Sequence, residues 1–151
     1  MIDWSRAVIA GLIAGLVFVM MEMLLVTVAM GQSPWGPPRM MAAIVMGRDV
    51  LPPPASFNFL IIMIGMMLHL VLSIAYAVLL AFIIRSMSMG AAIGIGALFG
   101  LILYLVNFFG LTAVFDWFAM ARNWVTVISH VAFGAVAAWY YRVAVPADGR
   151  A

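Results

Sequence analysis

Cysteine and lysine are both missing from this chain of 151 residues, and charged residues make up only 8% of it. Without cysteine the chain forms neither a disulfide nor a thiolate metal site. The basic residues are seven arginines, and the net charge of +2 is spread over short connecting segments. Such scattered charge makes no basic patch, so we expect no nucleic-acid partner.

Recognisable enzyme motifs are missing as well. The sequence has no phosphate-binding Gly-x-x-x-x-Gly-Lys loop, no Gly-x-Ser-x-Gly elbow and no His-Glu-x-x-His pair. These motifs carry much of the known chemistry on soluble substrates. We therefore expect a protein that is not an enzyme.

Hydrophobic residues are what the chain has in excess, at 68% of its length. Ordinary soluble domains are about 45–50% apolar, so this composition predicts an integral membrane protein. Four apolar segments are long enough to cross a hydrocarbon core, which takes about 20 residues. They cover residues 7–30, 57–84, 90–113 and 123–142. The fold class expected is an all-α integral membrane bundle of four transmembrane helices, forming one membrane domain over residues 1–151.

The connections between the spans differ in length. Residues 31–56 form the long outer loop, where prolines before residues 38–46 and a glycine after them predict a short interfacial or re-entrant helix. The link between the second and third spans is so short that these two should form an antiparallel neighbouring pair. The first apolar segment is longer than the core of a signal peptide, so we expect it to be retained as a span.

Aromatic residues and arginines indicate the ends of the spans and their orientation. Trp and Tyr prefer the membrane interface, and arginines are more frequent on the cytoplasmic side. With four crossings, one end of the bundle carries four of the arginines, and these are Arg6, Arg85, Arg142 and Arg150. The other end carries Arg39, Arg48 and Arg122. This excess predicts that both termini are cytoplasmic.

The first and third spans carry the same pattern of small and polar residues. The positions are Gly11, Gly15 and Glu22 in one span, and Gly96, Gly100 and Asn107 in the other. The span after each contains one of the two histidines, His69 or His130. The sequence thus predicts two tandem helical hairpins related by a parallel internal repeat. The glycine pairs should lie at helix–helix contacts, because small residues let backbones approach closely.

The polar residues of the repeat are the candidate site. Ionisable groups inside a membrane are expensive, so Glu22, His69 and His130, together with Asn107, should face the bundle interior. We expect Glu22 to hydrogen-bond to one of the other three. Side chains that could support such a site are Ser73, Tyr76, Tyr104, Thr126 and Ser129.

Three chemistries fit these residues. The two histidines could clamp a b-type haem, or they could hold a divalent metal ion together with Glu22. A carboxylate with two imidazoles could also relay protons or bind a polar ligand. Neither a Glu-x-x-His nor a His-x-x-x-His motif is present, so the cofactor and the metal stay open.

Three motifs resemble one group of proteins. They are the Gly-x-x-x-Gly helix with Met21-Glu22-Met23, the loop Ser33-Pro34-Trp35-Gly36-Pro37-Pro38-Arg39, and Ser129-His130-Val131-Ala132-Phe133-Gly134. With these motifs the chain resembles short, uncharacterised, four-span proteins of bacterial inner membranes. Some of these are described as sodium:proline symporters, a family whose members have many more spans. The resemblance implies a bacterial inner-membrane location and no functional residue.

The leading functional hypothesis is a non-enzymatic membrane protein, either an accessory or assembly subunit of a larger assembly or a module that binds a small ligand. A small oligomeric transporter or channel is one alternative, and a bis-histidine b-haem electron carrier is another. The partners expected are the lipid bilayer, and other membrane subunits or further copies of the chain.

Overall fold

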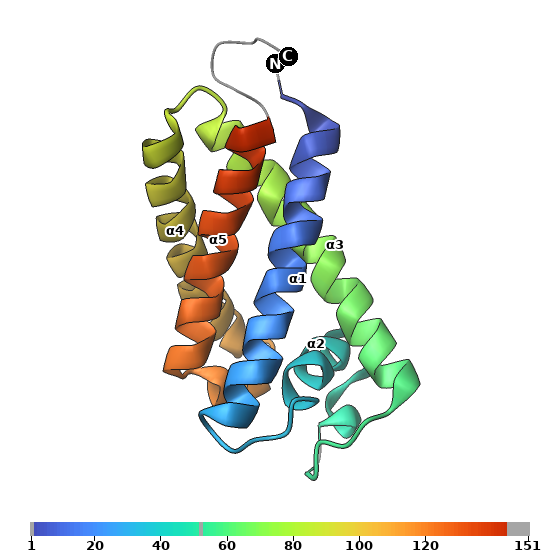
Figure 1. Cartoon of the computed structure of the whole chain (residues 1–151). Coiled ribbons are helices and arrows are strands. Elements are labelled where there is room, and N and C mark those ends of the chain that lie inside the picture. Colours follow the sequence, from blue (N-terminus) through green and yellow to red (C-terminus); the bar gives the residue numbers. More distant parts are fainter. Residues whose placement is uncertain (1, 52, 145–151) are drawn as a thin grey trace.

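The described residues of the computed structural model, 2–51 and 53–144, form five α-helices and no strand (Figure 1). The helices are α1 (Trp4–Val28), α2 (Gly36–Met46), α3 (Phe59–Ile84), α4 (Met89–Leu105) and α5 (Trp124–Ala144). Four stretches are long and apolar enough to cross a membrane, and these are Trp4–Val28, Phe59–Ile84, Met89–Ala113 and Trp124–Ala144. The all-helical class and the number of long apolar helices expected from the sequence are confirmed.

Polar residues set the starts of the long helices. The side chains of Asp3, Asn58 and Ser88 each accept a hydrogen bond from a backbone N–H of the first turn. Asn123 does the same for α5, where its Oδ1 atom lies 3.1 Å from the amide nitrogen of Thr126. These caps satisfy N–H groups that have no partner inside the helix, which is why the chain turns helical at these points.

The long helices pack in the spatial order α4, α5, α1, α3, and α2 packs on α3 near the loop end (Figure 1). The expectation that the second and third spans form a neighbouring pair is therefore wrong for most of their length, because α4 packs chiefly against α5. Away from their link, α3 leans outward, and α2 fills part of the resulting wedge.

Glycines explain these pairings. A Cβ atom added at Gly11 of α1 would lie 2.6 Å from the Cα atom of Ile74 in α3. A Cβ added at Gly96 or Gly100 of α4 would overlap a backbone carbonyl oxygen of α5, that of Gly134 or His130 respectively. Backbones this close leave no room for a side chain, so each glycine pair selects the helix that its own helix packs against.

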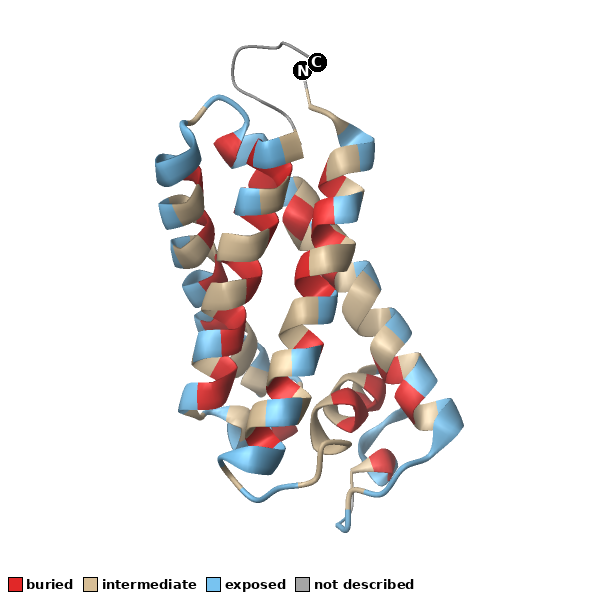
Figure 2. Cartoon of the chain, viewed as in Figure 1, coloured by how far each residue is buried: buried red, intermediate tan, exposed pale blue. Residues whose placement is uncertain are grey.

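The buried hydrophobic side chains form two clusters. Buried small and aliphatic side chains fill the half of the bundle near the termini, among them Ala7, Ala10, Ala14, Ala77, Leu80, Ala81, Ile84 and Ala137. A second cluster joins α2 to the outer segment Asp116–Ala121 through Ala42, Ala43, Val50, Trp117 and Phe118. Buried positions face inward along the long helices, while their outer faces are exposed (Figure 2).

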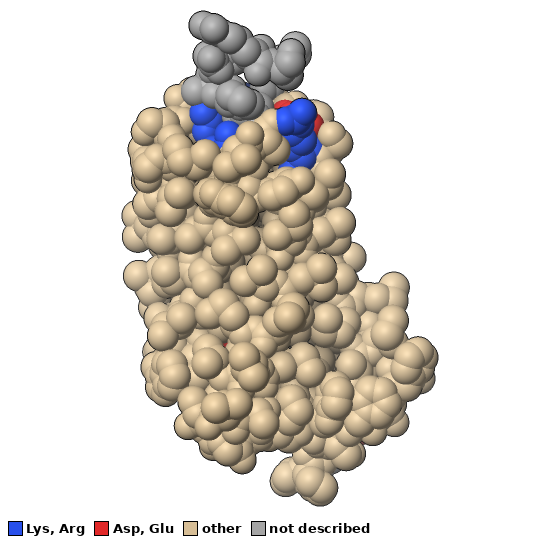
Figure 3. All heavy atoms as spheres, in the orientation of Figure 1, with Lys and Arg blue, Asp and Glu red and all other residues tan. Residues whose placement is uncertain are grey.

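The outer surface of the long helices is largely apolar. Large hydrophobic side chains are exposed along it, for example Met20, Leu24, Met67, Val71 and Leu98. In the view of Figure 3 the charged atoms gather at the end that holds the chain termini, and the rest of this face is almost entirely uncharged. Arg150 lies outside the described residues.

The lower end of the third predicted span is not regular α-helix. After Leu105 the chain forms a π-helical turn, Val106–Gly110, and then a 3-10 turn, Leu111–Ala113. Arg122 holds this turn, since its Nε atom lies 2.6 Å from the carbonyl oxygen of Phe108. π-Helical turns often occur at functional sites, and this one contains Asn107.

Candidate functional site

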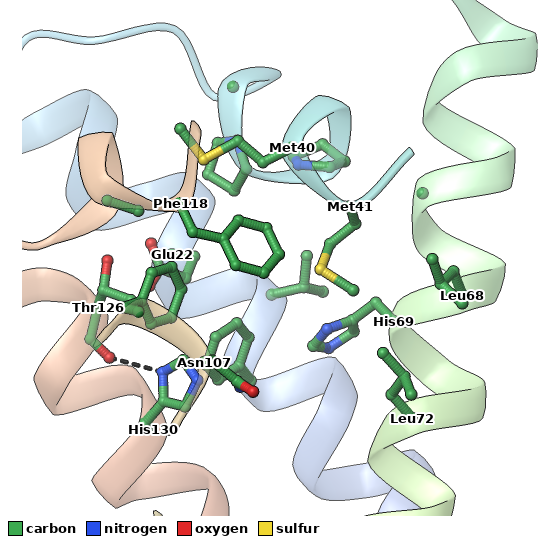
Figure 4. A pocket seen from close by; sticks show the side chains of 18 of the residues that line it. Glu22, Met40, Met41, Leu68, His69, Leu72, Asn107, Phe118, Thr126 and His130 are labelled. Atoms are coloured by element: carbon green, nitrogen blue, oxygen red, sulfur yellow. Dashed lines mark hydrogen bonds between the residues drawn. The ribbon is translucent and has the colours of Figure 1, made fainter. Parts of the chain in front are cut away.

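A cavity of about 350 Å³ occupies the wedge beside α2, and all five helices contribute to its wall (Figure 4). Most of its lining is aromatic or aliphatic, as in Phe18, Met40, Met41, Leu68, Leu72, Phe108, Phe118 and Phe133. The polar side chains of the lining include all four predicted site residues, which are Glu22, His69, Asn107 and His130. Three predicted supporting residues, Ser73, Tyr76 and Thr126, line it as well.

Glu22 is the acidic residue of this cavity and is only 4% exposed. α5 brings the hydroxyl groups of Thr126 and Ser129 next to its carboxyl group. Even so, Oε1 of Glu22 and Oγ of Ser129 are both buried without a hydrogen-bond partner within the described part of the chain. An unpaired buried polar atom is costly in an apolar setting, so this carboxyl group and the two hydroxyl groups beside it form a strained polar centre in the wall.

His69 connects α3 to α1. Its Nε2 atom lies 2.9 Å from the backbone carbonyl oxygen of Gly15. A carbonyl oxygen only accepts, so Nε2 carries the hydrogen, and Nδ1 of the neutral ring is left as an acceptor. The absence of a side chain at Gly15 lets Ser73 of α3 pack directly over it.

His130 bonds within its own helix. Its Nδ1 atom lies 2.8 Å from the carbonyl oxygen of Thr126 (Figure 4). By the same argument Nδ1 carries the hydrogen, and Nε2 of the neutral ring is the acceptor. The two histidines, although they are equivalent in the sequence pattern, therefore present opposite ring nitrogens as acceptors.

Phe18 packs against both histidines. Its ring centroid is 5.0 Å from that of His69 and 4.8 Å from that of His130. A bis-histidine haem needs the two imidazoles on opposite faces of one iron. Because the phenyl ring of Phe18 packs against both imidazoles, it occupies space that a haem between them would need, so this arrangement does not fit a haem clamp.

The hydrogen bond that the sequence predicted between Glu22 and another site residue is not found. Among the described residues no hydrogen bond links Glu22 to Asn107, His69 or His130. Each histidine uses a ring nitrogen on a backbone carbonyl instead. Within the same residues, no three His, Asp or Glu side chains come close enough together to hold a metal ion.

The remaining predicted residues lie at the edge of the cavity or behind its wall. Asn107 is partly buried and lies in the π-helical turn. The ring of Tyr104 packs against that of His130, with centroids 5.8 Å apart. Ser129 is completely buried beside Glu22.

Sequence reasoning missed the aromatic part of the site. Phe18, Phe108 and Phe118 carry no pattern that separates them from other apolar residues of the spans. Phe108 reaches the cavity only because the chain leaves the α-helical path after Leu105. The nearest signal in the sequence is Arg122, a charged residue close to a predicted span, which here holds the π-helical turn.

Comparison with protein-family models, with curated proteins and with solved structures finds no match to this chain.

Proposed function

We propose that this protein spans a bacterial inner membrane and binds a small amphipathic ligand in the cavity beside α2, without catalysing a reaction. One observation carries the proposal: polar side chains from four helical segments, among them Glu22, His69, Asn107 and His130, line a single cavity whose walls are otherwise apolar. Small-molecule sites typically combine apolar walls with a few convergent polar groups.

Membrane insertion fits the exposed apolar surface of the four long helices. A tandem duplication fits the packing of the glycines. Gly11 of α1 meets Ser73 and Ile74 of α3, while Gly96 of α4 meets Gly134 of α5. In each hairpin, the first glycine thus meets a small residue on the following long helix. In this proposal the termini lie in the cytoplasm and the cavity lies in the outer half of the membrane.

A continuous pore through one copy of the chain is less well supported. The half of the bundle near the termini is filled by buried side chains such as Ala14, Leu80, Ile84 and Tyr141. A cavity that is closed toward this half suits a binding site better than a conduit. Binding of this kind is compatible with a role as an accessory subunit in a larger membrane assembly.

Filling the cavity tests the proposal. Leu72 lines it, whereas its neighbour Val71 is 61% exposed on the outer face of α3. In phosphatidylcholine nanodiscs, radiolabelled decanol should bind saturably to the wild-type protein and to V71W. L72W should lose this binding, because the indole ring takes the space of the ligand. Absence of saturable binding to the wild-type protein, or equal binding by L72W and V71W, would contradict the proposal.

A further inference from the structure

The charges around the cavity are one-sided. Glu22 is the acidic residue of the lining, and no arginine is among the described residues that form it. The guanidinium group of Arg39, which lies nearby on α2, is occupied by the carbonyl oxygens of Val50 and Ser56. Arg122 is occupied in the same way by the carbonyl oxygen of Phe108. An anionic head group would thus meet a carboxyl group without a cation to balance it.

The ionisable side chains of the cavity offer hydrogen-bond acceptors. Glu22 lines the cavity, and its Oε1 atom has no hydrogen-bond partner within the described residues, although the hydroxyl groups of Thr126 and Ser129 lie beside the carboxyl group. Both histidines that line the cavity use an N–H on a backbone carbonyl, which leaves the other nitrogen of each neutral ring as an acceptor. A ligand with several N–H donors can bond to these acceptors.

Aromatic rings surround the same region. The ring of Phe108 lies 5.3 Å from that of Phe118 and 5.4 Å from that of His130, and Phe18 packs against His130 from α1. All of these residues line the cavity. The faces of aromatic rings attract cations, more strongly where water is excluded. The rings therefore favour the same sign of charge as the carboxyl group.

From these three observations we infer that the ligand is an amphipathic organic cation, an alkyl ammonium whose N–H groups bond to Glu22 while its apolar chain lies among the phenylalanine and methionine side chains. This inference rests on the proposed function, because it specifies the chemistry of the ligand for the same cavity. Glu22 is the residue that recognises the charge. The two histidines are held by hydrogen bonds to backbone carbonyl groups and pack against phenylalanine rings, so they form part of the aromatic wall around Glu22.

Three probes of equal chain length separate charge from apolar binding, namely decylammonium, decanol and decanoate. Their saturable binding is measured in phosphatidylcholine nanodiscs, with empty nanodiscs as background, for the wild-type protein, E22Q and D49N. Asp49 is an exposed acid of the outer loop and serves as the matched control. The unfolding temperature of each variant is recorded in the same nanodiscs.

E22Q should weaken decylammonium binding by about tenfold or more, because the ammonium then bonds to a neutral amide oxygen and loses its ion pair with the carboxylate. Its binding of decanol should stay within about twofold of the wild type, which also shows that the variant is folded. D49N should bind all three probes as the wild type does, and decanoate should bind most weakly throughout.

Two results would overturn the inference while leaving the proposed function in place. One is decanol binding accompanied by unchanged decylammonium affinity in E22Q, and the other is decanoate binding more tightly than decylammonium. Failure of all three probes to bind the wild-type protein would contradict the proposed function and the inference together.

Discussion

The imidazole of His69 is joined to the backbone of Gly15 on the facing helix, with 2.9 Å between Nε2 and the carbonyl oxygen. The bond crosses from α3 to α1 beside the place where Gly15 lets Ser73 approach. It therefore fixes the register of these two helices at the inner wall of the cavity. His130 makes no such crossing, since its bond returns to Thr126 on the same helix.

This asymmetry predicts two histidine tautomers in one protein. Nitrogen-15 NMR of histidine-labelled protein in detergent micelles should show one ring protonated at Nε2 and one protonated at Nδ1, under conditions where both rings are neutral. H69L should remove the Nε2–H signal and leave the other in place. It should also lower the free energy of unfolding by about 1 kcal/mol, as expected for one interhelical hydrogen bond in a membrane protein. Two identical tautomers would contradict the geometry.

The long helices could be predicted because each step is local. Four apolar runs of spanning length and a polar cap before each helix are properties of neighbouring residues, and they suffice for four long helices. The helix neighbours could not be predicted from the short link. Two spans joined by four residues must be close at the link, but Gly96 and Gly100 give α4 a closer fit to α5 than to α3.

The candidate site could likewise be predicted only in part. Their polarity within apolar spans suggested that Glu22, His69, Asn107 and His130 belong together, and all four line one cavity. Their hydrogen bonds could not be foreseen, because each histidine selects a backbone carbonyl that the sequence does not mark. The π-helical turn around Asn107 depends on a bond from Arg122, a residue 14 positions after the carbonyl that it holds.

Two glycines of α4 make a matched pair for testing the packing. Gly100 faces α5, where an added Cβ would overlap the carbonyl oxygen of His130, whereas Gly94 is exposed and has open space at the same position. G100A should lower the free energy of unfolding by about 1–3 kcal/mol through overpacking. G94A should leave it unchanged or raise it slightly, because alanine favours a helix. Unfolding in mild detergent followed by circular dichroism makes the comparison, and equal effects would contradict the assigned packing face.

Orientation is tested by reporters at the two ends of the bundle. A fluorescent protein that matures only in the cytoplasm should be active when fused after Ala151, because the arginine excess lies at the end of the termini. The same reporter inserted after Asp49 in the outer loop should be dark, and a phosphatase active only in the periplasm should give the opposite pattern. A phosphatase signal at Ala151 would reverse the orientation and place the cavity in the inner half of the membrane.

In the ligand-free protein, the carboxyl group of Glu22 makes no hydrogen bond to the other three predicted site residues within the described part of the chain. Had its carboxyl group been bonded to a histidine or to Asn107, replacing it with leucine would have left that partner unpaired and would have destabilised the fold. Instead its Oε1 atom has no hydrogen-bond partner within the residues that the structure describes, and a buried polar atom without a partner costs about 1–3 kcal/mol. E22L should therefore unfold at the same temperature as the wild type or a higher one in the absence of ligand, while it loses the response to decylammonium. The matched measurement is thermal unfolding with and without decylammonium, with D49N as the control. A large loss of stability in ligand-free E22L would show that the carboxyl group is a structural bond and not a site kept open for a ligand.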